Sequence, residues 1–185
     1  MSGVGIGVRR IRTTWLTVVV ALSLLVMATG VISANTPVVV SFSLTEDARV
    51  GGLEPVDYSS GKWHVTEVAG RLGIELEMKN LYLQVDDDWL TGGPYNMVVT
   101  IDFLCSEEGS FRLEYDSLVN DYAYEKGPYQ IIDADVVGKW NRAEWTFEGV
   151  QFSNRQNGKS DMRIRIKGDE LPLLIGAMTI TATQQ

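Results

Sequence analysis

Apolar and polar residues alternate with a period of two through most of the chain after residue 35. The clearest case is the segment 141–166, in which every second residue of AEWTF is apolar. Side chains two positions apart face the same side of a β-strand, so this pattern predicts a half-buried strand. Asn157-Gly158 then favours the positive φ angles of a tight turn, and the alternation resumes over residues 162–166. We therefore predict a two-faced β-hairpin over this segment.

Similar patterns recur along the rest of the chain. They cover residues 38–44, 62–67, 71–79, 81–85, 96–105, 111–115, 131–137 and 171–183. Together they give about nine or ten short strands with turn signals between them, which is typical of an all-β sandwich. So many strands favour a jelly roll over an open barrel. The predicted fold is an all-β jelly-roll β-sandwich formed by a single domain, residues 35–185.

The first part of the chain has a different pattern. Three arginines precede an uncharged apolar run over residues 15–27, and residues 28–34 are small and uncharged. This layout predicts a helical signal peptide over residues 1–34, with cleavage after Ala34. The alternative is an uncleaved anchor, because residues 15–34 approach the ~20 residues of a spanning helix. The protein is then secreted or held at the cell envelope, tethered to the membrane if the leader stays.

Charge narrows the choice of partners. The chain has 16 basic and 24 acidic residues, a formal net charge of −8. Loss of the leader removes three arginines and brings the net charge to −11, with 13 basic residues left against 24 acidic ones. This excess of acid repels phosphate backbones and anionic lipid, which argues against nucleic acid and against a membrane surface beyond the leader. Neutral or cationic ligands remain compatible with it.

Cysteine usage bears on stability. Cys105 is the only cysteine, so an exported chain cannot form an internal disulfide and must depend on its core. Cys105 is in phase with the apolar residues of the strand 96–105. We therefore expect it to be a buried apolar residue rather than a nucleophile.

Three stretches carry a resemblance to a known family. They read LYLQVDDDWLTGGPYNMVVTIDFL, GSFRLEYDS and GKWNRAEWTFEGVQFSNRQNGKSDMRIRI. Together they cover residues 81–166 and resemble secreted bacterial β-sandwich domains of the carbohydrate-binding-module or galactose-binding-domain-like type. The most specific part comprises Phe152, Asn154, Arg155, Asn157, Gly158, Asp161, Arg163 and Ile164. The resemblance implies a non-catalytic exported module that binds a glycan or polysaccharide.

Sugar binding by such a module needs an exposed aromatic ring together with polar groups for the hydroxyls. Tyr122 and Tyr124 are two residues apart in a polar segment and would form a platform if that segment is extended. The alternative is that they fold down and cover the edge of the sandwich. Trp63 and Trp89, at strand ends or in loops, are the next candidates.

Two polar groups of residues have both a functional and a structural interpretation. Arg155 and Asn157 either contact the ligand or hold the turn together. The run Asp86, Asp87 and Asp88 is either a structural Ca²⁺ site or a solvated turn, because adjacent side chains of a strand diverge.

Catalysis has little support in the sequence. His64 is the only histidine, which leaves no histidine cluster for zinc, and no nucleophile or phosphate-binding motif is present. A glycosidase would need a carboxylate pair drawn from Glu107, Glu108, Glu114 and Asp116. We expect a non-enzymatic glycan-binding or cell-envelope accessory protein. The alternative is a structural or protein-interaction sandwich without a sugar site.

Overall fold

The structure is a computed structural model that describes residues 36–43, 51–168 and 171–185, without the side chains of Ser43 and residues 120–123. The predicted leader, residues 1–34, lies outside the described residues. Within the described ranges, no helix has the length and hydropathy that a membrane span requires.

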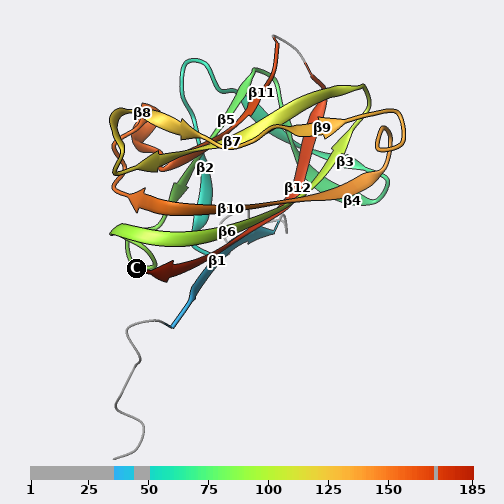
Figure 1. The fold of residues 1–185 in the computed structure, drawn as a ribbon. Helices are drawn as coiled ribbons and strands as arrows, with labels where there is room; N and C mark the ends of the chain where they lie inside the picture. The colour runs from blue at the N-terminus through green and yellow to red at the C-terminus, as the bar shows by residue number, and fades with distance from the viewer. Residues whose placement is uncertain (1–35, 44–50, 169–170) are drawn as a thin grey trace, which may run out of the picture. The chain divides into compact units, whose positions relative to one another are not determined.

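The domain is built from antiparallel strands (Figure 1). The strands are β1 (Val38–Ser43), β2 (Leu53–Val56), β3 (Trp63–Val68), β4 (Arg71–Leu76), β5 (Asn80–Val85), β6 (Gly92–Cys105), β7 (Gly109–Ser117), β8 (Asn120–Lys126), β9 (Gln130–Ile132), β10 (Trp140–Phe152), β11 (Met162–Ile166) and β12 (Leu173–Gln184). A short 3-10 turn, Asn157–Lys159, precedes β11. This confirms the predicted all-β class.

The strands form one path that folds back on itself. Its order is β2-β5-β11-β7-β10-β6-β12-β4-β3, with β1 added to β12 and with β8 and β9 added to β7. Between β7 and β10 the path is joined only by the pair Val150 and Ser117. The chain therefore forms two layers, and Figure 1 shows the β5, β11 and β7 layer above the β6 and β10 layer.

The hydrophobic core lies between these two layers. Phe111 of β7 contacts Phe103 of β6 and Trp145 of β10, with ring centroids 5.0 and 5.8 Å apart. Alternate residues of β6, β10 and β11 enter this core, as the period of two predicts. Cys105 is a free thiol and is 1% exposed, which confirms that it is a buried apolar residue.

The predicted hairpin over residues 141–166 is wrong. β10 pairs with β6, whereas β11 pairs with β5 and β7, so the two strands belong to opposite layers. Alternation shows that each strand has one buried face, but it does not show which strand is its neighbour. The positive φ expected at the turn does occur, at Gly158 (φ 70), within the 3-10 turn.

Candidate functional site

Tyr124 is a buried residue of β8. Its side chain is 5% exposed, its Oη lies 2.5 Å from Oγ of Ser160, and Arg163 lies 4.4 Å from its ring centroid. Burial raises the pKa of the Tyr124 phenol. The ring therefore packs against its own layer and has no open face for a sugar. The predicted platform of two tyrosines is therefore wrong for Tyr124, whereas the side chain of Tyr122 lies outside the described residues and its role stays a prediction.

Arg155 and Asn157 take part in structural contacts. The Arg155 guanidinium donates to both carboxylate oxygens of Asp116, from Nε at 3.0 Å and from Nη2 at 2.7 Å. Asp116 is fully buried, so this fork keeps its charge from being buried alone. The carbonyl of Asn157 accepts the hydroxyl of Ser160 at 2.7 Å. These contacts agree with the structural interpretation, and a contact of Arg155 or Asn157 with a ligand stays a prediction.

Glu114, beside Asp116 on β7, is also fully buried. Arg112 Nε donates to its Oε1 and Arg163 Nε to its Oε2, each at 2.7 Å. We call the set Arg112, Glu114, Asp116, Tyr124, Arg155 and Arg163 the buried polar cluster. Its two carboxylates, which were candidates for a glycosidase, are each held by arginine.

An open cavity of about 580 Å³ lies beside β2 and the turn after β5, and we call it the Trp89 pocket. Its lining comprises Gly51, Gly52, Leu53, Glu54, Gln84, Asp86, Asp87 and Trp89. Strand pairing creates it, because Glu54 of β2 lies directly opposite Gln84 of β5. Trp89 and two of the three predicted aspartates therefore meet at one place.

The turn after β5 positions Trp89. The carbonyl of Asp86 accepts the amides of Trp89 and Leu90, at 2.9 and 3.2 Å, and the Asp86 carboxylate accepts the amide of Asp88 at 2.9 Å. Leu90 is 1% exposed and anchors the turn in the core. The indole of Trp89 is thereby held at the surface, 48% exposed.

The Trp89 ring lies with one face on the backbone of Gly52. A Cβ added to Gly52 would lie 2.9 to 3.0 Å from three ring atoms of Trp89, Cγ, Cδ1 and Cδ2. Nearly equal distances to three atoms of one ring place the glycine over the ring face. The residue is 48% exposed in spite of this contact, so part of the indole is accessible to solvent or ligand, as stacking on a sugar requires.

Hydrogen bonds hold the acidic side of the pocket. Asp87 accepts the side-chain amide of Asn154 at 2.8 Å. Behind it, Asp161 is 1% exposed and accepts the backbone amides of Val85 and Asn154, each at 2.9 Å. Burial raises the pKa of Asp161 to about 6, against the lowering effect of these amides, and the charge of Asp87 adds to the rise.

Asp86, Asp87 and Asp88 form a turn in this structure. Within the described ranges, no three or more histidine, cysteine, aspartate or glutamate residues are grouped so that they could hold a metal ion. The Asp86 carboxylate caps the turn and Asp87 binds Asn154, as described above. The structure thus accounts for these residues by the turn.

Trp63 lines a second cavity, of about 540 Å³, and also packs against the core. The other lining residues are Asp57, Tyr58, Ser59, Gly61, Lys62 and Glu77. Sequence reasoning missed Tyr58, Glu54 and Gln84. The pair Gly51-Gly52 was the available signal, because adjacent glycines indicate positive φ or a close approach.

Comparison with known proteins gives a likeness of fold. No protein-family model matches the chain, and no curated protein matches it. Among solved structures, the CBM22-1 xylan-binding domain of Paenibacillus barcinonensis Xyn10C aligns with a TM-score of 0.55 and 13% identity, over 84% of this chain and 99% of that one. At this identity the likeness shows the fold alone. The chain has the β-sandwich fold of a carbohydrate-binding module, which confirms the predicted resemblance at that level.

Two further structures are similar at lower scores. A family 29 carbohydrate-binding module of Piromyces equi has a TM-score of 0.49 and 13% identity, over 80% of this chain and 91% of that one. The CBM22-1 and GH10 modules of Clostridium thermocellum Xyn10B, complexed with xylohexaose, have a TM-score of 0.48 and 15% identity. That match covers 77% of this chain and 28% of the two-module chain.

Proposed function

We propose that the protein is an exported, non-catalytic glycan-binding module and that it binds sugar in the Trp89 pocket. One observation carries this proposal: a half-exposed indole that packs on Gly52 lines an open cavity together with carboxylates and an amide. The ring provides stacking on a pyranose, and Asp86, Asp87 and Gln84 provide acceptors and a donor for its hydroxyls. The fold of carbohydrate-binding modules supports the same function.

The test is a glycan array with the purified protein, followed by titration of the best ligand. We expect Trp89→Ala to lower the affinity between about 5-fold and about 150-fold, because an aromatic contact of this kind contributes about 1 to 3 kcal/mol when desolvated. Tyr129→Ala is the matched control, since Tyr129 is 37% exposed and does not line the pocket. Equal losses in the two variants would show that the glycan binds outside the Trp89 pocket, whereas no glycan bound by the folded protein would favour a protein-interaction sandwich.

Export is a separate part of the proposal. The arginines, apolar run and small residues of residues 1–34 support a cleaved leader. Intact mass of the protein from the producing cells tests it, and a mature chain that starts at Asn35 is the expected result. A mass that includes residues 1–34 would indicate the uncleaved anchor.

A further inference from the structure

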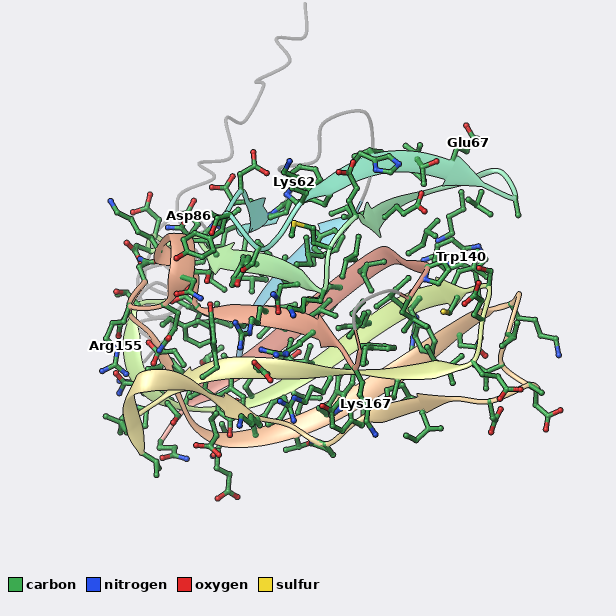
Figure 2. The ribbon with its side chains drawn as sticks, turned by 90° about the horizontal axis from the view of Figure 1, so that it is seen from above. Lys62, Glu67, Asp86, Trp140, Arg155 and Lys167 are labelled. Carbon is green, nitrogen blue, oxygen red and sulfur yellow. The ribbon has the colours of Figure 1, made fainter. Side chains whose placement is uncertain are left out.

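The two cavities lie at the two ends of one edge strand. Leu53 and Glu54 at the start of β2 line the Trp89 pocket, and Asp57 and Tyr58, directly after β2, line the second cavity. From Glu54 to Asp57 the chain rises about 10 Å, at roughly 3.3 Å per residue of strand. Figure 2 shows Asp86 of the first cavity and Lys62 of the second on the same side of the molecule.

The second cavity has the same kind of chemistry as the first. Tyr58 is 39% exposed, and its ring is held edge-on by Tyr82, with centroids 5.2 Å apart. Asp57, Ser59, Lys62 and Glu77 supply polar groups around it. Nε1 of Trp63 is buried and has no hydrogen-bond partner among the described residues, so it lacks the kind of acceptor that a ligand hydroxyl provides. An aromatic ring surrounded by hydrogen-bonding groups thus occurs at both ends of β2.

The edge between the cavities is poorly suited to a protein strand. Pro55 lies in the middle of β2, and proline has no backbone N–H to donate to an added strand. A partner that binds through ring stacking and hydroxyl groups does not need that donor. The edge therefore favours a glycan over strand addition.

The charge of the cavities restricts the class of glycan. The described lining of the Trp89 pocket holds three carboxylates, on Glu54, Asp86 and Asp87, and no basic side chain. The second cavity adds Asp57 and Glu77 against Lys62. Such a surface repels sugars that carry carboxylates of their own, because like charges at short range cost free energy.

We propose that the second cavity is a second subsite, so that one extended glycan chain without carboxylate groups occupies both ends of β2. This rests on the proposed function of the Trp89 pocket. A single sugar ring does not span both cavities, so the ligand is several sugars long. Trp89 stacks on one part of the chain and Tyr58 on another.

Titration calorimetry with oligosaccharide ladders tests this inference. The probes are β-1,4-linked glucose, xylose, mannose and N-acetylglucosamine oligomers of two to six sugars, with oligogalacturonates as the acidic ladder. For the ladder that binds best, we expect at least a tenfold gain in affinity from two to six sugars. Tyr58→Ala should abolish this gain and leave disaccharide binding unchanged, whereas Tyr58→Phe should retain the gain because it keeps the ring. Trp89→Ala should weaken every length.

The outcomes separate the two proposals. Equal affinity for two and six sugars, or a gain with length that survives Tyr58→Ala, would overturn the second subsite and leave the Trp89 pocket standing. Oligogalacturonates that bind as tightly as the neutral ladder would overturn the proposed class of ligand. If no ladder binds to folded protein, the second subsite fails, and the proposed function fails with it when the glycan array also finds no ligand.

Discussion

Two regions in the layer of β2, β5, β11 and β7 both combine aromatic rings with carboxylates, but one region is buried and the other is exposed. The buried polar cluster combines tyrosine, carboxylates and arginines, and its carboxylates on Glu114 and Asp116 are fully buried and paired with arginine. The Trp89 pocket combines an indole, carboxylates and an amide, but its ring is 48% exposed beside an open cavity. Composition alone does not separate a binding site from a structural network. Exposure distinguishes the two regions, because hydrogen bonds hold carboxylates in both of them.

Asp161 connects the two regions. Its carboxylate accepts the backbone amides of Val85 and Asn154. Val85 precedes Asp86 of the pocket, and the side-chain amide of Asn154 donates to Asp87. Its own carbonyl accepts the amide of Asp116 at 2.8 Å. The buried polar cluster is therefore linked to the Trp89 pocket through Asp161. Mutations can test whether the cluster contributes to stability and the pocket to binding.

The largest effect should come from Glu114→Ala. Removal of this carboxylate leaves Arg112 and Arg163 without their buried partner, and an uncompensated buried charge costs about 3 to 5 kcal/mol of unfolding free energy. Urea denaturation measures the loss. Glu148→Ala is the control, because Glu148 is exposed and should change stability by less than about 0.5 kcal/mol. A loss below about 1 kcal/mol in Glu114→Ala would show that the cluster is not structural.

The second effect is the pH dependence caused by Asp161. Its pKa is about 6 in the folded protein against an ordinary value of 3.8, so between these pH values the folded state keeps a proton that the unfolded state has lost. Its contribution to stability is complete below the ordinary value and is lost as pH rises through about 6. The pKa difference corresponds to about 3 kcal/mol.

Asp161→Asn cannot titrate and should remove this contribution. Free energies of unfolding of both proteins, measured from pH 4 to pH 7, should show the difference between them changing by about 2.4 kcal/mol, because at pH 4 the unfolded carboxyl is still partly protonated. The Asp102 carboxyl, whose pKa is lowered by its bonds to Arg142 and Arg71, titrates in both proteins and cancels in the difference. Parallel curves would contradict the assignment of the raised pKa to Asp161.

The fold class was predictable because burial of one face leaves its period in each strand. Strand pairing was not, and the error in segment 141–166 shows why. Trp145 and Ile164 enter the same core from opposite layers, so their alternation looks like that of two paired strands. Nothing within that segment shows that β6 is the neighbour of one strand and β5 of the other.

The candidate site was predictable only in part, because the sequence does not show which segments are neighbours in space. Trp89 and Tyr124 both follow or occupy polar segments, and the sequence ranked Tyr124 first. Tyr124 is buried, and its hydroxyl forms a hydrogen bond with the hydroxyl of Ser160, 36 residues away. Trp89 is exposed because the nearby Asp86 turn and Gly52 hold it outward. Ser160 and Gly52 are distant in the sequence from the rings that they contact. The tertiary fold brings them together, so local sequence patterns do not predict these contacts.

The smallest effect on stability, and the sharpest separation of the two regions, should come from a pair of glycine variants. Gly52 (φ +79) and Gly70 (φ +73) both have backbone conformations that a side chain disfavours. Alanine at either position should therefore cost about 1 to 2 kcal/mol. Only at Gly52 would the new Cβ meet the Trp89 ring, since nothing lies within 4 Å of a Cβ at Gly70.

The two variants should thus lose similar stability but differ in function. Gly52→Ala should displace the indole and lower glycan affinity several-fold, whereas Gly70→Ala should bind like the parent protein. Thermal unfolding and titration of the same samples measure both quantities. If both variants bind normally, the position of the Trp89 ring on Gly52 does not matter for the ligand. If both lose affinity equally, the loss follows from general destabilisation, and the support that Gly52 gives to Trp89 would not be part of the site.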